Sequence, residues 1–230
     1  MVDFANFEKK AGITFINKDL LRQAFVHRSY LNENKWYGHG HNERLEFLGD
    51  AVLELVVTDH LYHKFPENNE GDLTAYRSAL VNANTCASVA TDLGVNDYLL
   101  LSKGEAKDTG RARTFILANT LEAIIGSIYL DQGYDIAKKF IVEHILTLVG
   151  NVIKDGTWID SKSLFQEKAQ EETGITPSYK TVKETGPDHD KHFTVGVYLN
   201  KDLIATGDGQ SKQDAEQEAA KKALETKGWA

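Results

Sequence analysis

Residues 41–54 read HNERLEFLGDAVLE and form the most informative stretch of the chain. At about 100° per residue, a helix places four acidic side chains on one narrow face: Glu43, Glu46, Asp50 and Glu54. Apolar side chains are expected on the opposite face: Leu45, Leu48, Val52, Leu55 and Val56. Asn42 stands where it can cap the helix start. The stretch therefore predicts an amphipathic helix with a face of carboxylates.

This acidic face has two interpretations. The ordinary one is a solvated surface, as on most amphipathic helices. However, like charges four residues apart are mildly destabilising, and Glu46, Asp50 and Glu54 form two successive pairs with no lysine between them. A bound cation that neutralises the cluster is the second interpretation.

A second helix is expected at residues 115–130, which are apolar almost all round. Glu122 is the only charged residue there, and Asn119 precedes it by about one turn on the same face. A buried carboxylate is costly unless it is paired or binds a metal. Glu122 therefore either pairs with an arginine such as Arg44 or Arg28, or joins the acidic face in an all-oxygen site suited to Mg²⁺ or Mn²⁺. The residues alone leave both possibilities open.

The chain is expected to form two domains of different class. The helical pattern of residues 1–150 predicts an all-α domain, and residues 151–159 are expected to be a linker. Residues 160–230 predict a small α+β domain of order α-β-β-β-α. Its helices are expected at residues 163–172 and 214–224, and its strands at 179–182, 193–199 and 203–206.

Composition limits the possible functions. Lys+Arg 26 against Asp+Glu 34 gives a formal net charge of -8, which argues against a nucleic-acid binder unless a local basic patch exists. The single cysteine, Cys86, excludes an internal disulfide and a multi-cysteine zinc site. We find neither a secretory signal nor a membrane-spanning stretch, so we expect a cytoplasmic protein without a membrane partner.

Residues 41–50 resemble the signature of the ribonuclease III family almost letter for letter. Residues 25–30, 70–73 and 123–131 resemble further blocks of that family in the same order. The resemblance implies a homodimeric endonuclease that cuts both strands of double-stranded RNA with Mg²⁺, for which Mn²⁺ can substitute. It also implies 5′-phosphate and 3′-hydroxyl ends with short 3′ overhangs, and roles in processing ribosomal RNA precursors, messenger RNA and small RNAs.

The same resemblance assigns roles to individual residues. It implies metal ligands at Glu46, Asp50, Asn119 and Glu122, of which Asp50 and Glu122 match the catalytic positions. Glu43 and Glu70 match accessory acidic positions, and Phe47 matches an aromatic residue that inserts into the partner subunit. The chain departs from the family at Asn119, where Asp is common. An amide oxygen can still bind Mg²⁺, but one negative charge is lost.

The C-terminal segment resembles a double-stranded RNA-binding domain through residues 165–170, 186–189, 207–216 and 219–224. Such domains read the shape, 2′-hydroxyls and phosphates of RNA. The resemblance implies that Gln166, Glu167 and Gln170 contact one minor groove and that His189 reaches the next. Ser211 and Lys212, at the start of the last helix, would hold phosphate between them.

Two rival functions remain. The first is a non-catalytic RNA-binding protein of the same fold, in which Asn119 weakens the metal site. The second is a histidine-based metal centre of the His-Asp phosphohydrolase type. Its candidate ligands lie in two groups: His39 and His41, and His60 and His63.

Overall fold

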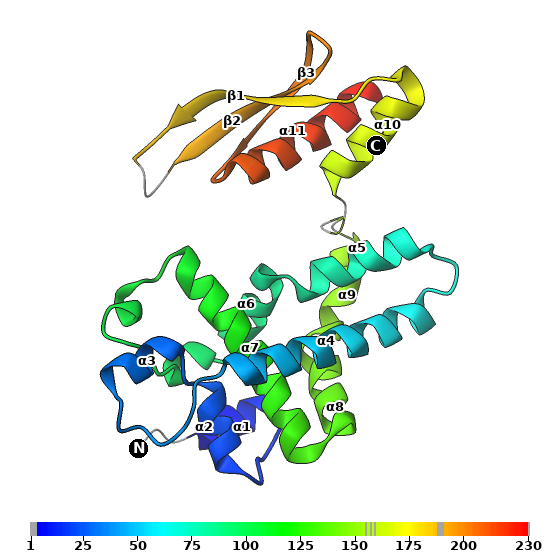
Figure 1. The fold of residues 1–230 in the computed structure, drawn as a ribbon. Coiled ribbons are helices and arrows are strands. Elements are labelled where there is room, and N and C mark those ends of the chain that lie inside the picture. The colour runs from blue at the N-terminus through cyan, green and yellow to red at the C-terminus, as the bar shows by residue number, and fades with distance from the viewer. Residues whose placement is uncertain (1–3, 155, 157, 159, 188–190, 230) are drawn as a thin grey trace. The chain divides into compact units, whose positions relative to one another are not determined.

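The computed structural model describes residues 4–154, 156, 158, 160–187 and 191–229 (Figure 1). The chain divides into two compact units, Met1–Trp158 and Ile159–Ala230. In the described residues, no helix has the length and apolar character needed to cross a membrane.

The first unit is helical, as predicted. Val26 and Leu100 form an isolated parallel bridge, and the described residues of this unit form no strand. Its α-helices are α1 (Ala5–Ala11), α2 (Lys18–Ala24), α3 (Arg28–Glu33), α4 (Glu43–Lys64), α5 (Glu70–Val81), α6 (Ala83–Asp92), α7 (Arg111–Gln132), α8 (Tyr134–His144) and α9 (Val149–Lys154). Short 3₁₀ helices are η1 (Val95–Tyr98), η2 (Glu105–Lys107) and η3 (Leu146–Leu148).

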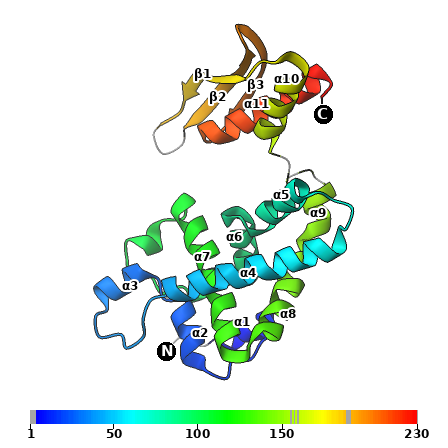
Figure 2. The ribbon, with the colours of Figure 1, turned by 45° about the vertical axis from the view of Figure 1, so that its right-hand side comes forward.

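The two longest helices, α4 and α7, cross at the centre of this unit (Figures 1 and 2). Their backbones meet at two glycines. A Cβ atom on Gly49 would lie 1.7 Å from the carbonyl oxygen of Glu122, and one on Gly126 would lie 2.2 Å from the carbonyl oxygen of Leu45. No larger residue fits at either position without moving a helix. This close crossing brings the acidic face of α4 against the turn of α7 that carries Glu122.

One local prediction for α4 is wrong. Asn42 occupies the N-cap position, but its side chain makes no capping bond and instead donates to the Ala24 carbonyl at 3.1 Å. It is almost fully buried, so it ties the start of α4 to α2 rather than capping a free helix end. Leu55 belongs to the apolar face predicted opposite the carboxylates, yet 58% of it is exposed. The apolar face of α4 is therefore divided between the core and the surface.

The end of the first unit packs back onto α5. The Trp158 ring lies edge-on to Tyr76, with ring centroids 4.8 Å apart. The expected linker at residues 151–159 thus overlaps α9, which continues to Lys154.

The second unit confirms the predicted α-β-β-β-α order. It comprises α10 (Ser161–Thr173), β1 (Ser178–Thr185), β2 (His192–Leu199), β3 (Asp202–Gly209) and α11 (Lys212–Lys227), and its antiparallel sheet has the order β1-β2-β3. Phe165 from α10, Val197 from β2 and Ala219 from α11 are fully buried in its core. A Cβ on Gly207 would lie 2.1 Å from the Ala219 nitrogen, so β3 lies directly against α11.

Candidate active site

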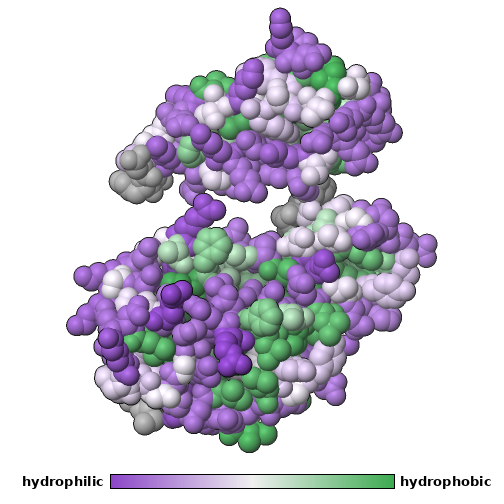
Figure 3. All heavy atoms as spheres, viewed as in Figure 1, coloured by the Kyte–Doolittle hydropathy of each residue, from purple (hydrophilic) through white to green (hydrophobic). Residues whose placement is uncertain are grey.

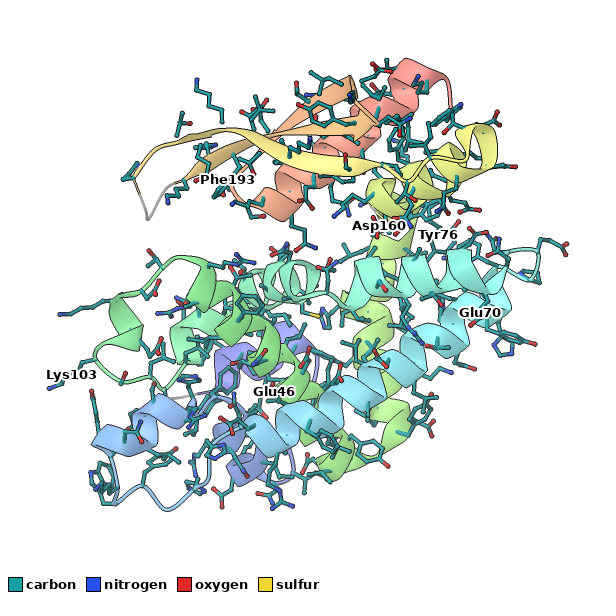
Figure 4. The ribbon with its side chains drawn as sticks, turned by 45° about the horizontal axis from the view of Figure 1, so that its top comes forward. Glu46, Glu70, Tyr76, Lys103, Asp160 and Phe193 are labelled. Atoms are coloured by element: carbon teal, nitrogen blue, oxygen red, sulfur yellow. The ribbon has the colours of Figure 1, made fainter. Side chains whose placement is uncertain are left out.

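Four of the predicted site residues come together at the crossing of α4 and α7. Glu46 and Asp50 stand one turn apart on α4, and Asn119 and Glu122 stand about one turn apart on α7. The Asn119 side chain lies close enough to the Glu46 carboxylate to lower its pKa, against the raising effect of burial. Figure 4 labels Glu46 where α4 passes α7. Side chains from both helices thus form one polar cluster at the close approach of the two backbones.

The cluster carries more negative charge than its surroundings stabilise. Burial, with the charges of Asp50 and Glu46, raises the pKa of Glu122 from its ordinary 4.5 to about 7. Burial also raises the pKa of Glu46, with Glu43 and Asp50 adding to the effect, and raises that of Asp50, with Glu54 contributing. All three carboxyl groups are therefore biased towards their neutral forms.

The expected alternative of an arginine partner for Glu122 finds no support in the described residues. Arg28 pairs instead with Glu43, at 3.5 Å between Nη1 and Oε1. Arg44 is exposed and forms no ion pair with Glu122 among the described side chains. The groups that act on the Glu122 carboxylate are themselves carboxylates.

The donor chemistry of the cluster suits a hard divalent cation, since it offers carboxylate oxygens and one amide oxygen. In the part of the chain that is described, no three His, Cys, Asp or Glu side chains are arranged as a ready metal site. Mg²⁺ does not require such an arrangement, because it retains several waters and is commonly held by one or two carboxylates. The residues therefore fit a partly hydrated cation better than a closed protein cage.

The raised pKa of Glu122 gives a prediction for the metal-free protein. The neutral carboxyl is favoured in the fold, so its stabilising contribution is complete below pH 4.5 and is lost as the pH rises to about 7. In EDTA, Glu122→Gln is expected to match wild type near pH 4.5 and to be about 1–2 kcal/mol more stable at pH 8. Urea unfolding at both pH values measures this difference, and equal stabilities at pH 8 would contradict it.

The two accessory acids lie in different places. Glu43 begins α4, one turn before Glu46, and its carboxylate also approaches His41 Nδ1 at 3.7 Å. Glu70 begins α5 and lines a cavity of about 450 Å³ beside the C-terminal half of α4. Figure 4 shows Glu70 well apart from Glu46. Within one chain, the structure therefore joins Glu43 to the acidic cluster but not Glu70.

Phe47 lies next to the cluster and points away from the core. It is 81% exposed, and Leu55 and Tyr62 on the same helix are 58% and 68% exposed. Figure 3 shows hydrophobic residues gathered over the middle of α4. An apolar strip of this kind on a central helix is typical of a protein–protein contact.

The histidine alternative gains no support. His60 and His63 line an open cavity with Asp59, but Lys138 already pairs with Asp59 at 2.8 Å. His39 lies 3.8 Å from Asp19. Among the described residues, none of these histidines belongs to a group of three or more side chains that could hold a metal.

In the second unit, the predicted RNA-contacting residues on α10 are exposed: Gln166, Glu167 and Gln170. Gln170 donates to the Thr176 hydroxyl at 3.2 Å. Ser211 caps α11 by accepting from the Asp214 backbone nitrogen at 3.1 Å, and Lys212 begins that helix. His189 lies outside the described residues.

Sequence reasoning missed two groups of residues. One is the pair of glycines at the helix crossing, Gly49 and Gly126. Their position inside long helices was a signal, because glycine costs a helix interior about 1 kcal/mol relative to alanine. The other is the surroundings of Lys212, where Glu184 and Phe193 both contact its ammonium group.

A helical unit with a carboxylate cluster, followed by an α-β-β-β-α unit, defines a class of protein with a metal-dependent catalytic domain and a separate binding module. A family model described as Ribonuclease-III-like matches residues 17–149. A second, described as Double-stranded RNA binding motif, matches residues 161–227. The chain belongs to the ribonuclease III family, as the sequence resemblance predicted.

Relatives of known identity match along nearly the whole chain. Ribonuclease 3 of Borreliella burgdorferi is 43% identical over 220 residues, covering 96% of this chain and 89% of that protein. Ribonuclease 3 of Enterococcus faecalis is 44% identical over 222 residues, covering 95% of each. A structure of the nuclease domain of ribonuclease III from Campylobacter jejuni is 40% identical, with a TM-score of 0.58, and covers 63% of this chain and 97% of that one.

Proposed function

We propose that this chain is an endoribonuclease that hydrolyses both strands of double-stranded RNA with the help of a divalent cation. The observation that carries the proposal is the acidic cluster at the crossing of α4 and α7, joined in one chain to a double-stranded RNA-binding module. The products are proposed to carry 5′-phosphate and 3′-hydroxyl ends with short 3′ overhangs. Ribosomal RNA precursors, messenger RNA and small RNAs in the cytoplasm are the proposed substrates.

Glu46, Asp50 and Glu122 are the proposed metal-binding carboxylates, and Asn119 adds an amide oxygen. Mg²⁺, or Mn²⁺ in its place, supplies Lewis-acid chemistry that lowers the pKa of an attacking water and neutralises charge on the phosphoryl group. Burial, with mutual repulsion added to it, raises the pKa values of the three acids, and this supports the role because a bound cation stabilises their ionised forms. Asp50 and Glu122 are the proposed catalytic pair.

Asn119 has a defined part in this arrangement. Its amide side chain stabilises the ionised Glu46 carboxylate and so offsets part of the rise in the pKa of that group. An aspartate at this position would add a further negative charge beside Glu46. We infer that Asn119 lowers the charge of the site but keeps its ligands oriented, so activity is expected with either metal.

A homodimer completes the proposed enzyme. Phe47 is exposed, and the cavity beside the far half of α4 has an apolar wall that includes Leu61 and Leu73. In a twofold dimer through α4, Phe47 of each copy would enter this cavity of the other. Glu70 lines the same cavity, so the dimer would bring it near the acidic cluster of the second copy. This accounts for the distance between Glu70 and Glu46 within one chain.

Phe47→Ala is expected to weaken the dimer about 100-fold, because a central aromatic anchor is lost from both halves of the interface. Sedimentation equilibrium of the full chain measures the dimer dissociation constant. Ile16→Ala is the matched control, since Ile16 is equally exposed, at 81%, but lies outside α4. Equal effects of the two substitutions would contradict the proposed interface.

RNA recognition is assigned to the second unit. Gln166, Glu167 and Gln170 on the exposed face of α10 are proposed to contact one minor groove, and His189 the next. Ser211 and Lys212 at the start of α11 are proposed to hold the phosphates between the grooves. Because the two contact regions are far apart on the RNA, a duplex of about 16 base pairs is required to engage both.

The test of the proposed function is a cleavage assay on a perfectly paired RNA and on its separate strands. Incubation with Mg²⁺, with Mn²⁺ and with EDTA is expected to give short duplexes only from paired RNA and only with a metal. Cleavage of single strands, or cleavage in EDTA, would contradict the proposal. Binding without cleavage even in Mn²⁺ would instead identify a non-catalytic RNA-binding member of the family.

A further inference from the structure

The ammonium group of Lys212 lies between two side chains of the sheet. Its Nζ is 3.1 Å from Oε1 of Glu184 on β1 and 5.6 Å from the ring centroid of Phe193 on β2. Glu184 and Phe193 are direct neighbours in the β1–β2 ladder. Figure 4 labels Phe193 near the start of α11. Three elements thus contribute to one charged contact at the N-terminus of α11.

A bulge in β1 creates this contact. The register of β1 against β2 shifts between Thr181 and Lys183, and after the shift Glu184 pairs with Phe193. If the regular register continued past Thr181 without the bulge, Glu184 would pair with His192, and its side chain would leave the face on which Phe193 supports Lys212. The bulge therefore places the Glu184 carboxylate on the face of the sheet where it contacts Lys212.

We propose that Glu184 is an affinity-setting residue, whose carboxylate competes with an RNA phosphate for Lys212 and so weakens the binding of double-stranded RNA. The inference rests on the proposed function, which places Lys212 at a phosphate. Glu184 opposes that contact in two ways. It neutralises the lysine in the free protein, and it repels a phosphate that approaches the same ammonium group.

The pair is exposed enough to exchange partners. The Lys212 and Glu184 side chains are 58% and 42% exposed, and ion pairs exposed to this extent are only weakly held. A phosphate at the N-terminus of α11 gains in addition from the free backbone N–H groups of that helix. An RNA phosphate can therefore displace the Glu184 carboxylate from Lys212. Because the ion pair must be broken first, RNA binds more weakly than it would to an unpaired lysine.

The rest of the helix start cannot compensate. Residues 207–215 lead into α11 and include its first turn. Lys212 is the only basic residue in this segment, which also contains Asp208 and Asp214. The next residue, Gln213, is neutral. Acidic residues also outnumber basic ones across residues 159–230. The ion pair with Glu184 therefore determines how available Lys212 is to a phosphate at this end of the binding surface.

The test measures binding of the full chain to a fluorescent, perfectly paired RNA by anisotropy in EDTA, where metal-dependent cleavage cannot proceed. Glu184→Gln is expected to lower Kd about 2- to 5-fold. Glu225→Gln is the matched control, because it removes the same charge from an exposed position at the other end of α11. Lys212→Ala is expected to raise Kd, and adding Glu184→Gln to it is expected to change nothing further. The gain from Glu184→Gln should shrink as salt is added.

Equal Kd values for Glu184→Gln and Glu225→Gln contradict the inference, because the effect is then one of net charge. A gain that persists in the Lys212→Ala background also contradicts it, because Lys212 is then not the group for which Glu184 competes. A wild-type chain that binds no paired RNA contradicts the proposed function, and the inference falls with it. The three outcomes are distinguished by the same set of four variants and wild type.

Discussion

Glu122→Gln is expected to slow the cleavage of double-stranded RNA about 10³-fold. The substitution removes one negative charge from the acidic cluster, and the charge stabilisation lost with a metal ligand amounts to several kcal/mol. Glutamine keeps the size of the side chain and removes the group whose pKa burial raises to about 7, so folding is preserved. Single-turnover cleavage of a paired RNA in Mg²⁺ measures the rate.

Two comparisons make this result specific. Glu143→Gln removes the same charge from an exposed position on α8 and is expected to leave the rate within about 2-fold of wild type. Binding of paired RNA in EDTA is expected to survive in Glu122→Gln, because RNA recognition is assigned to the second unit. If Glu122→Gln cleaves paired RNA at the wild-type rate, Glu122 has no catalytic role.

Gly49→Ala is expected to destabilise the first unit by about 3–5 kcal/mol. Its new Cβ would stand 1.7 Å from the Glu122 carbonyl oxygen, which belongs to the backbone of α7 and cannot rotate away. The helices must therefore separate, and the same movement takes Glu122 away from Glu46 and Asp50. Cleavage is expected to fall together with stability. Urea unfolding and the cleavage assay measure the two losses.

Gly150→Ala is the matched control for this prediction. Gly150 lies within α9, and a Cβ there would meet no atom within 4 Å. Because alanine is a better helix former than glycine, this variant is expected to be as stable as wild type or more stable by up to about 1 kcal/mol. If Gly49→Ala unfolds at the same urea concentration as Gly150→Ala, the close crossing of α4 and α7 is wrong.

The acidic face of α4 could be predicted from sequence because it depends on spacing along one helix. Glu122 could be identified for a similar reason, as a lone charge in an apolar helix. The contact between the acidic face of α4 and Glu122 could not be predicted from helical spacing, since it depends on the close approach of Gly49 to the backbone of α7. The family resemblance supplied that pairing, whereas helical periodicity did not.

Two features of α4 lie beyond what helical periodicity can predict. Helical periodicity separates polar from apolar faces, but it does not distinguish a core contact from an exposed apolar strip. Leu55 follows the apolar pattern of the face opposite the carboxylates, yet 58% of it is exposed. Asn42 was assigned a local capping bond, and its side chain instead reaches the Ala24 carbonyl on a segment distant in sequence.

In the second unit, the strands could be located by alternation, but their register could not. The extra residue in β1 shifts every later pair by one position. That shift places Glu184 opposite Phe193 and beside Lys212. If the alternation of apolar and polar residues is continued through β1 without the bulge, Glu184 is predicted to pair with His192 instead of Phe193.

The most direct test of the central claim is a titration of the full chain with Mn²⁺, followed by electron paramagnetic resonance of free and bound metal. Mn²⁺ is expected to bind at the cluster of Glu46, Asp50, Asn119 and Glu122, with an affinity at least 10-fold weaker in Glu122→Gln and unchanged in Glu143→Gln. Equal Mn²⁺ affinity in wild type and Glu122→Gln would contradict the assignment of the metal to the crossing of α4 and α7.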